Sequence, residues 1–406
     1  MECAEDKFRV PLDIEPINVV KNEPLSNFFT RFNPVYGALA LLFMGVIIIG
    51  ATTYVEGTLF PGNPGKTRVP LMKDVNDIAL IVGYLPGLFF VSLLYYKHIK
   101  KLQIELFQYR VVGNKEFNSV DEISKITDTD KRNREKYISF LKNFCRWYCS
   151  PWVTFGCIVI TIIVTYFGFL KTFLGLDTWH TRVVEGDGRI LSVGGTLYTI
   201  FIFALYIYLF ANLLYRGIVT TILVYRMFKN FTMNIEFLHP DKCGGLKIIG
   251  DLANTFNFAV FIGGLNVVSL LFTHTEIIGI PSPHYTNMIP LVAYIVLAPM
   301  MFFGTLYATH KKMKETKMSL QRNISVKYDI LFKKNHSKAS TGNVDTAATE
   351  QLTDLEKAYE TIEQVPEWPI HISMIRNLFG TLLIPIVTHF SPNIINIINK
   401  IRPFFK

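Results

Sequence analysis

The stretch ILSVGGTLYTIFIFALYIYLFANLLY, residues 190 to 215, contains no charged side chain. A helix needs about 20 apolar residues to cross the hydrocarbon core of a bilayer. Inside lipid, only a helix or a closed barrel satisfies its own backbone hydrogen bonds, and this stretch lacks the strict alternation of a barrel strand. It therefore predicts a transmembrane helix.

Five further stretches have a similar length and almost no charge, so the same argument applies to each of them. The sequence therefore predicts an all-α fold, a polytopic integral membrane helical bundle with six transmembrane helices. The five stretches are Val35 to Tyr54, Ile78 to Tyr96, Pro151 to Leu170, Leu252 to Thr273 and Met288 to Thr309.

Lysine and arginine are distributed unevenly among the segments that connect these spans. Of the 41 Lys and Arg residues, 35 lie before the first span, between the second and third, between the fourth and fifth, and after the sixth. All four segments would share one side of the membrane, and cytoplasmic loops carry such an excess. Both chain termini are therefore predicted to be cytoplasmic, and the long cytoplasmic segments are expected to form a second, helical layer.

This topology divides the chain into six regions. No cleaved secretory signal is visible in the first region, a cytosolic N-terminal arm. The last region contains an apolar run that is short for a span, so an amphipathic or re-entrant membrane-associated helix is predicted there. The regions are 1–34 for the arm, 35–96 for transmembrane helices 1 and 2, 97–150 for a basic cytosolic helical region, 151–309 for transmembrane helices 3 to 6, 310–369 for cytosolic helices joined by a linker at 335–351, and 370–406 for the C-terminal helix.

The second and fourth spans are predicted to continue as helices into the cytosol, because their helical period persists beyond the apolar residues. Lys97, Lys100 and Lys101 follow the second span at spacings of three and four, and Arg226 and Lys229 lie in the extension of the fourth. A net charge of +9 and aromatic residues interleaved with cations suit a polyanion such as single-stranded nucleic acid. Binding of anionic lipid stays open as the alternative.

The fifth predicted span carries a polar stripe. At 100 degrees per residue, five polar residues fall within an arc of about 120 degrees. Such a stripe is able to line a pore, and it is equally able to form hydrogen bonds between helices of a bundle. Gly263 and Gly264 fit close packing of helices. The residues predicted to line a pore are Asp251, Asn254, Thr255, Asn266 and Ser269.

A turn with the sequence HPDKCGGL, residues 239 to 246, precedes this span. Pro240 ends a helix, Asp241 can accept hydrogen bonds from the backbone that follows, and the two glycines permit positive φ. A nest of backbone N–H groups flanked by Lys242 and Lys247 is able to hold a phosphate. A capped chain reversal that needs no ligand is the other interpretation, and the sequence favours it.

The residue pattern predicts no catalytic residue, no metal and no cofactor. The turn offers one His, one Asp and one Cys without an oriented base. Cys145 and Cys149 are one helical turn apart, which makes a metal site only if further ligands converge on them. The outer loops lack clustered ligand spacing, and we assign no chemistry to their polar and aromatic residues, which are Trp179, His180, His274, Glu276 and His284.

Two motifs carry a resemblance to a known family. They are the HPDKCGGL turn before a hydrophobic span and the step Glu367-Trp368-Pro369-Ile370 before a late apolar helix. The sequence resembles a family of bacterial polytopic membrane proteins that share an HPD-x-x-GGL turn and a late WP step. The resemblance covers roughly residues 190 to 390. Within that family the sequence resembles the membrane channels of Hailong anti-phage systems, in which single-stranded DNA made by a partner nucleotidyltransferase holds the channel inactive. Cys243 stands where the family has a smaller residue, and only the turn can be matched residue by residue.

The resemblance implies an anti-phage defence effector in the bacterial inner membrane. With the residue pattern, it predicts a homo-oligomeric ion channel in membrane lipid, a tetramer by expectation, that single-stranded DNA holds closed and that depends on a nucleotidyltransferase through its product. The alternatives are a secondary transporter, for which the kinks at Pro86-Gly87 and Pro299 are typical, and a membrane-embedded enzyme that uses His239 and Asp241. The residues predicted to bind the ligand or nucleic acid are Lys97, Lys100, Lys101, Arg110, Arg226, Lys229, His239, Lys242 and Lys247.

Overall fold

The computed structural model describes most of the central part of the chain. The N-terminal arm, most of the predicted C-terminal helix, and Arg110, His239 and Lys242 lie outside the described residues, so the predictions made for them stay predictions. The described residues are 33–60, 69–108, 123–170, 174, 178–184, 188–231, 235, 241, 243–272, 284–339, 346–369, 376, 379, 380 and 383.

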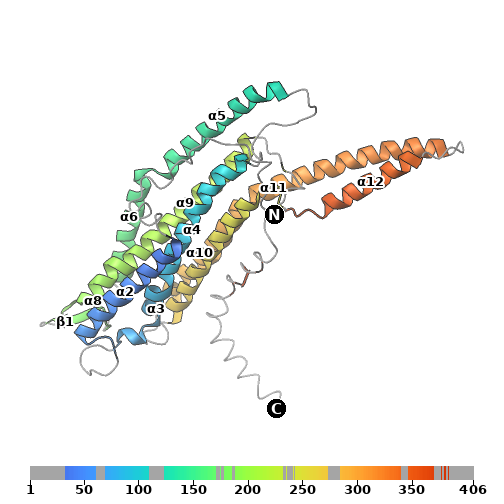
Figure 1. The fold of residues 1–406 in the computed structure, drawn as a ribbon. Coiled ribbons are helices and arrows are strands. Elements are labelled where there is room, and N and C mark those ends of the chain that lie inside the picture. The colour runs from blue at the N-terminus through green and yellow to red at the C-terminus, as the bar shows by residue number, and fades with distance from the viewer. Residues whose placement is uncertain are drawn as a thin grey trace, which may run out of the picture.

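The fold is a bundle of long helices, which confirms the predicted all-α class (Figure 1). The long helices are α2 (Pro34–Glu56), α4 (Leu85–Gln108), α5 (Ile123–Tyr148), α6 (Pro151–Val164), α9 (Ala204–Asn230), α10 (Lys247–Phe272), α11 (His284–Ala339) and α12 (Thr346–Glu363). Shorter elements are the 3₁₀ turn η3 (Leu71–Lys73), α3 (Val75–Ala79), α8 (Val193–Leu197), and the π-helical segments η4 (Leu80–Tyr84), η6 (Thr165–Leu170) and η7 (Tyr198–Phe203).

Five helical runs among the described residues are long and apolar enough to cross a membrane, which indicates a multi-pass membrane protein. Each of them overlaps one of the first five predicted spans, and the exact ends of the spans stay predictions. The predicted sixth span, Met288 to Thr309, forms the first part of α11, and its crossing of the membrane stays a prediction. The five runs are Pro34–Glu56, Val75–Gln103, Glu135–Phe167, Val193–Asn230 and Lys247–Ser269.

Helix α4 lies at the centre of the bundle and packs against α2, α9 and α10, while α11 packs against α9 and α10 and α6 lies on the outside of α9. Tyr95 of α4 is fully buried and donates a hydrogen bond to the Arg216 carbonyl of α9 at 3.1 Å. The Arg216 guanidinium lies 4.5 Å from the ring centre of Tyr148 and 5.0 Å from that of Tyr96, and its Nε donates to Asn212 at 2.6 Å. These contacts tie α4, α5 and α9 together.

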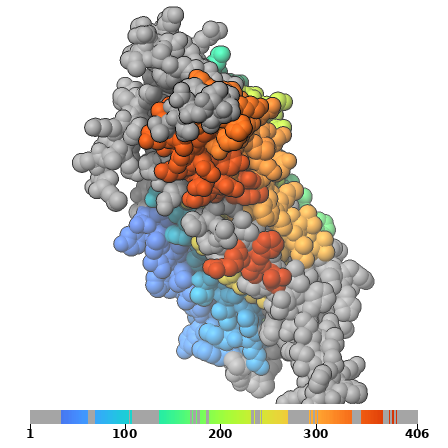
Figure 2. Space-filling view, turned by 90° about the vertical axis from the view of Figure 1, so that its right-hand side faces the viewer, coloured from blue at the N-terminus to red at the C-terminus, as the bar shows by residue number. Residues whose placement is uncertain are grey.

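The predicted extensions beyond the apolar spans are present, since α4 continues to Gln108 and α9 to Asn230. Helix α11 also leaves the bundle, and α12 packs along it in the opposite direction; Figure 2 shows the two together at the upper end of the molecule, with α2 and α3 at the lower end. The predicted linker at 335–351 was too long, because α11 extends to Ala339 and α12 begins at Thr346.

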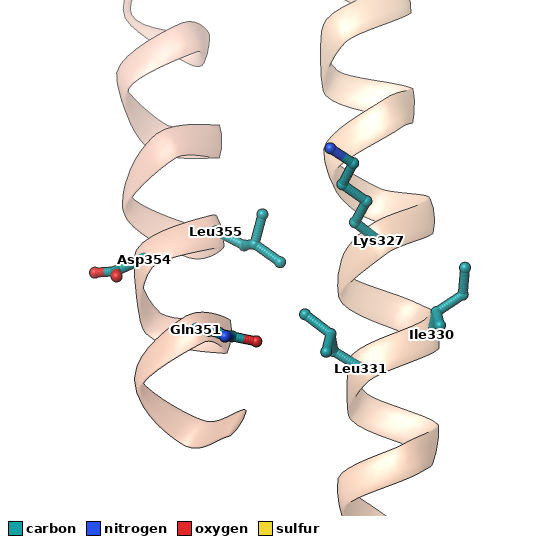
Figure 3. A pocket seen from close by; sticks show the side chains of 6 residues that line it. All are labelled: Lys327, Ile330, Leu331, Gln351, Asp354 and Leu355. Atoms are coloured by element: carbon teal, nitrogen blue, oxygen red, sulfur yellow. The ribbon is translucent and has the colours of Figure 1, made fainter. Parts of the chain in front are cut away.

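The α11–α12 pair has a partly apolar seam. In Figure 3, Leu331 and Leu355 point toward one another between the two helices, whereas Asp354 and Ile330 point away from the gap. Nearer the bundle, Lys317 Nζ donates hydrogen bonds to the carbonyls of residues 363 and 365, at 2.7 and 2.9 Å.

The WP step then returns the chain to α11. The ring of Trp368 stacks on His310 with 4.0 Å between ring centres, and the carbonyl of Glu367 lies 3.0 Å from His310 Nδ1. Trp368 also meets Phe303 edge-on. The step therefore fixes the end of the α11–α12 pair at the border of the predicted sixth span.

One prediction of secondary structure was wrong. A two-stranded antiparallel hairpin, β1 (Thr181–Val184) and β2 (Gly188–Leu191), interrupts the all-α fold, and β2 contains the predicted start of the fourth span at Ile190. The helix begins after Ser192, whose side chain accepts a hydrogen bond from the Gly195 amide at 2.8 Å. A serine N-cap satisfies a backbone donor that would otherwise lack a partner, which ends the strand and starts the helix.

Candidate functional site

The polar stripe of α10 faces α4. His98 Nδ1 of α4 lies 2.8 Å from Thr255 Oγ1, and Tyr84 shares a hydrogen bond with Ser269 and donates another to the Leu265 carbonyl at 2.9 Å. Thr255 is buried within the chain. Two of the five predicted pore residues therefore join helices of one chain, which is the alternative that the sequence left open.

The other three stripe residues, Asp251, Asn254 and Asn266, are half-buried. Across the same helix, Gly264 lies under Tyr294 of α11: a Cβ there would be 2.5 Å from the tyrosine hydroxyl. The predicted close packing at Gly264 is confirmed. Since one side of α10 contacts α4 and another contacts α11, a pore along α10 would need a further copy of the chain.

The HPDKCGGL turn is a capped reversal. Asp241 Oδ1 accepts hydrogen bonds from the amides of Cys243 at 2.8 Å and Gly245 at 3.1 Å, and Oδ2 accepts one from the Lys247 amide at 3.2 Å. Gly244 and Gly245 have φ of 67 and 83 degrees, values that glycine adopts without strain. The Asp241 carboxylate thus occupies the position that the phosphate hypothesis gave to an external anion.

The same geometry bears on the enzyme hypothesis. The Asp241 carboxylate is engaged by three backbone donors, so it is poorly placed to act as a general base. Burial raises the pKa of the Cys243 thiol to about 11, which keeps it protonated at neutral pH and makes it a weak nucleophile.

The predicted ligand-binding cations that the structure describes lie at one end of the bundle, which we call the basic end. Lys97, Lys100 and Lys101 are exposed on α4, and Arg226 and Lys229 are exposed on α9. Helices α4 and α9 pack against each other. Lys101 also forms an ion pair with Glu105 at 3.0 Å, which is solvent-exposed on the lysine side and contributes little. Lys247, at the start of α10, is exposed next to the turn.

A cluster that sequence reasoning missed lies at the opposite end, which we call the hairpin end because β1 and β2 are there (Figure 1). Asp74, Asp77 and His180 are all buried, and one possible ligand atom of each lies within 4.8 Å of the others. His180 Nε2 is 2.9 Å from Asp77 Oδ2. The expectation that His180 belongs to no cluster is therefore wrong.

Backbone contacts between three distant segments build this cluster. Asp74 caps α3 by accepting a hydrogen bond from the Asp77 amide at 3.2 Å. His180 is held by the chain on both sides: the Trp179 amide donates to the Val69 carbonyl at 2.9 Å, and the Ser192 amide donates to the His180 carbonyl at 2.8 Å. The cluster is thus part of a rigid framework rather than of an open loop.

The electrostatics follow from burial. Burial raises the pKa of the Asp74 carboxyl to about 8, and the nearby Asp77 adds to the rise. Burial lowers the pKa of His180 to about 3, so the imidazole is neutral at neutral pH. Tyr198, at the start of η7, donates a hydrogen bond to Asp77 Oδ1 at 2.5 Å.

The sequence offered one signal for part of this cluster: the D-x-x-D spacing of Asp74 and Asp77 is that of an N-capped first turn of a helix.

Comparison with known proteins gives no identification, since no family model, curated protein or solved structure matches the chain.

Proposed function

We propose that the chain is the subunit of a homo-oligomeric ion channel, acting in the bacterial inner membrane as an anti-phage effector, and that a cytosolic polyanion controls its opening. Single-stranded DNA, the product of a partner nucleotidyltransferase, is the first candidate for this ligand. The proposal places the basic end in the cytosol, in keeping with the excess of cations on that side of the predicted spans.

The observation that carries the proposal is the continuity of α4 and α9. Each helix runs from the apolar bundle to exposed cations at the basic end without a break between the span and the cations. Tyr95 and Arg216 join the two helices where they leave the apolar region. A ligand held between these cations therefore acts on the helices of the bundle, and it shifts the population toward the state that it binds more tightly.

The conducting path of this channel would lie between copies of the chain. Within one chain, Thr255 is engaged with α4 and Ser269 with η4, so Asp251, Asn254 and Asn266 remain as the stripe residues for an oligomer axis. Rings of one polar residue around an axis are a simple way to set selectivity.

The experiment measures binding and current on purified protein. The ratio of absorbance at nucleic-acid and protein wavelengths reports bound nucleic acid, and planar-bilayer currents are recorded before and after nuclease. In one variant, glutamine replaces five basic-end cations: Lys97, Lys100, Lys101, Arg226 and Lys229. In the matched control, glutamine replaces five exposed cations of α11: Lys311, Lys314, Arg322, Lys327 and Lys333.

The basic-end variant is expected to bind a labelled single strand more weakly, and the slope of log affinity against log salt falls by about 0.7 for each phosphate that the variant no longer neutralises. The control loses the same charge and keeps most of the affinity. Binding that does not depend on salt, or equal losses in both variants, contradicts the proposal. Absence of current after nuclease treatment contradicts the channel function.

A proton-coupled secondary transporter is the second candidate, and the cluster at the hairpin end favours it. Two buried carboxyl groups, Asp74 and Asp77, lie at the start of the helical run of the second span, just before the π segment η4, and Tyr198 opens a π segment in the fourth. Transporters bind their coupling ions at such interrupted helices. Uptake of solute into vesicles driven by a pH gradient, without channel currents, would favour this function.

A further inference from the structure

The cluster at the hairpin end has the composition and burial of a metal site. Asp74, Asp77 and His180 are 3%, 2% and 0% exposed, and each offers a ligand atom to a common point. Two carboxylate oxygens and one imidazole nitrogen form a donor set that suits divalent zinc, manganese or iron. We propose that these three residues bind a divalent transition-metal ion, with zinc as the first probe.

Hydrogen bonds orient both carboxyl groups of the cluster, and the Asp74 and Asp77 side chains are also hydrogen-bonded to each other. Tyr198 donates to Asp77 Oδ1, and the Asp77 amide donates to Asp74 Oδ1. Asp77 Oδ2 is fully buried and lies 2.9 Å from His180 Nε2. Carboxylates that bind a metal ion are themselves held in place by hydrogen bonds from neighbouring groups, as these two are.

The orientation of His180 fits the same role. Its Nδ1 lies 3.2 Å from Thr178 Oγ1, which leaves Nε2 directed at Asp77. Metal-binding histidines nearly always have such a partner on the second ring nitrogen, and they bind in the neutral form.

The charge of the cluster gives the ion its binding energy. Two carboxylates are buried together, and none of the ion pairs between described residues joins either of them to a lysine or arginine. Buried carboxylates are costly unless they are paired, protonated or bound to a metal. A divalent cation that displaces the proton of Asp74 neutralises both carboxylates at once, and the backbone contacts of Trp179 and Ser192 hold the ligands in place before it binds.

The test uses the full chain in detergent. After treatment with a chelator and reloading with zinc, elemental analysis is expected to find about one ion per chain, and zinc should raise the midpoint of thermal unfolding. The His180→Ala variant is expected to lose the ion. The Thr178→Val variant keeps all three ligands and is expected to bind zinc about 10- to 100-fold more weakly, the usual effect of removing the partner of a ligating histidine.

The matched control is a double variant of exposed residues on the α11–α12 pair, His336→Gln with Asp354→Asn, which is expected to bind zinc as the wild type does. Wild-type protein that retains no zinc and shows no thermal shift with zinc or manganese overturns the proposal, whatever the variants do. Equal loss of zinc in the control and in Thr178→Val overturns it too, because the ion would then lie elsewhere.

Discussion

Replacing Gly195 with alanine should break the framework of the hairpin end without altering any side chain of the Asp74, Asp77 and His180 cluster. A Cβ on Gly195 would lie 2.2 Å from the His180 carbonyl oxygen, 2.8 Å from its Cα and 2.9 Å from its carbonyl carbon. All three atoms are backbone, so no rotation of a side chain relieves the overlap. The segment that carries His180 must move away by roughly 1 Å to restore van der Waals contact.

The cost can be estimated from opposing terms. Overpacking of a rigid site costs about 1–3 kcal/mol, and displacing His180 also weakens the Ser192 amide hydrogen bond, about 0.5–1.5 kcal/mol. Replacing a helical glycine by alanine stabilises the helix by about 1 kcal/mol, which offsets part of this cost. The variant should therefore lose about 0.5–3.5 kcal/mol of unfolding free energy.

The assay is titration with a denaturing detergent, followed by circular dichroism. Gly156→Ala in α6 is the control, because a Cβ there meets nothing within 4 Å and the substitution should be neutral or slightly stabilising. Gly194→Ala should lie between the two, since its Cβ meets the ends of side chains, those of Glu56 and Thr53 at 3.1 Å and that of Thr52 at 3.4 Å. If Gly195→Ala is as stable as Gly156→Ala, the His180 segment does not pack on α8 as described.

Substitutions at three further positions test other parts of the fold with the same titration or with proteolysis. Asp241→Ala removes the acceptor of three backbone donors and should cost about 1–3 kcal/mol, whereas Asp241→Asn, which keeps one side-chain oxygen, should cost less; equal losses would argue against the capped turn. Tyr95→Phe removes the hydroxyl that bonds Arg216 and Thr220 and should cost about 1 kcal/mol, and an unchanged midpoint would mean that these bonds add nothing. Trp368→Ala removes the ring that stacks on His310 and should make the α11–α12 pair more accessible to trypsin; an unchanged rate of cleavage would show that the WP step does not hold the pair.

The sequence could predict what depends on local composition. Span length and absence of charge are properties of each stretch alone, so five spans and the extensions of α4 and α9 were found where they were expected. The polar stripe of α10 was also found, but its partner was not. Tyr84 at the end of η4 and His98 of α4 are 14 residues apart, as are Ser269 and Thr255 of α10, and in an antiparallel pair these match four turns of helix. That match can be recognised only once the two helices are known to be neighbours.

The cluster at the hairpin end illustrates what sequence could not supply. Asp77 and His180 are separated by more than 100 positions, and they meet because the chain pairs Val69 with Thr178 and places Ser192 against the His180 carbonyl. None of these contacts has a periodic signature. Ser192 lies inside an apolar run, where a single polar residue is easily taken as part of the span, yet it caps the helix and orders the loop before it.

The helical run from Val75 to Gln108 joins the two ends of the molecule, since Asp77 lies in its first turn and Lys97, Lys100 and Lys101 lie near its end. If zinc at the first site and a single strand at the second favour different arrangements of this run, each ligand must change the affinity of the other by the same factor, because coupling between binding sites is reciprocal. Titrating oligonucleotide with and without zinc, and zinc with and without oligonucleotide, measures that factor twice. Unequal factors would show that one ligand acts at a second site. If both factors equal one, zinc and the oligonucleotide bind independently of each other. The π segment at residues 80–84 would then separate the two ends of the helical run rather than couple them.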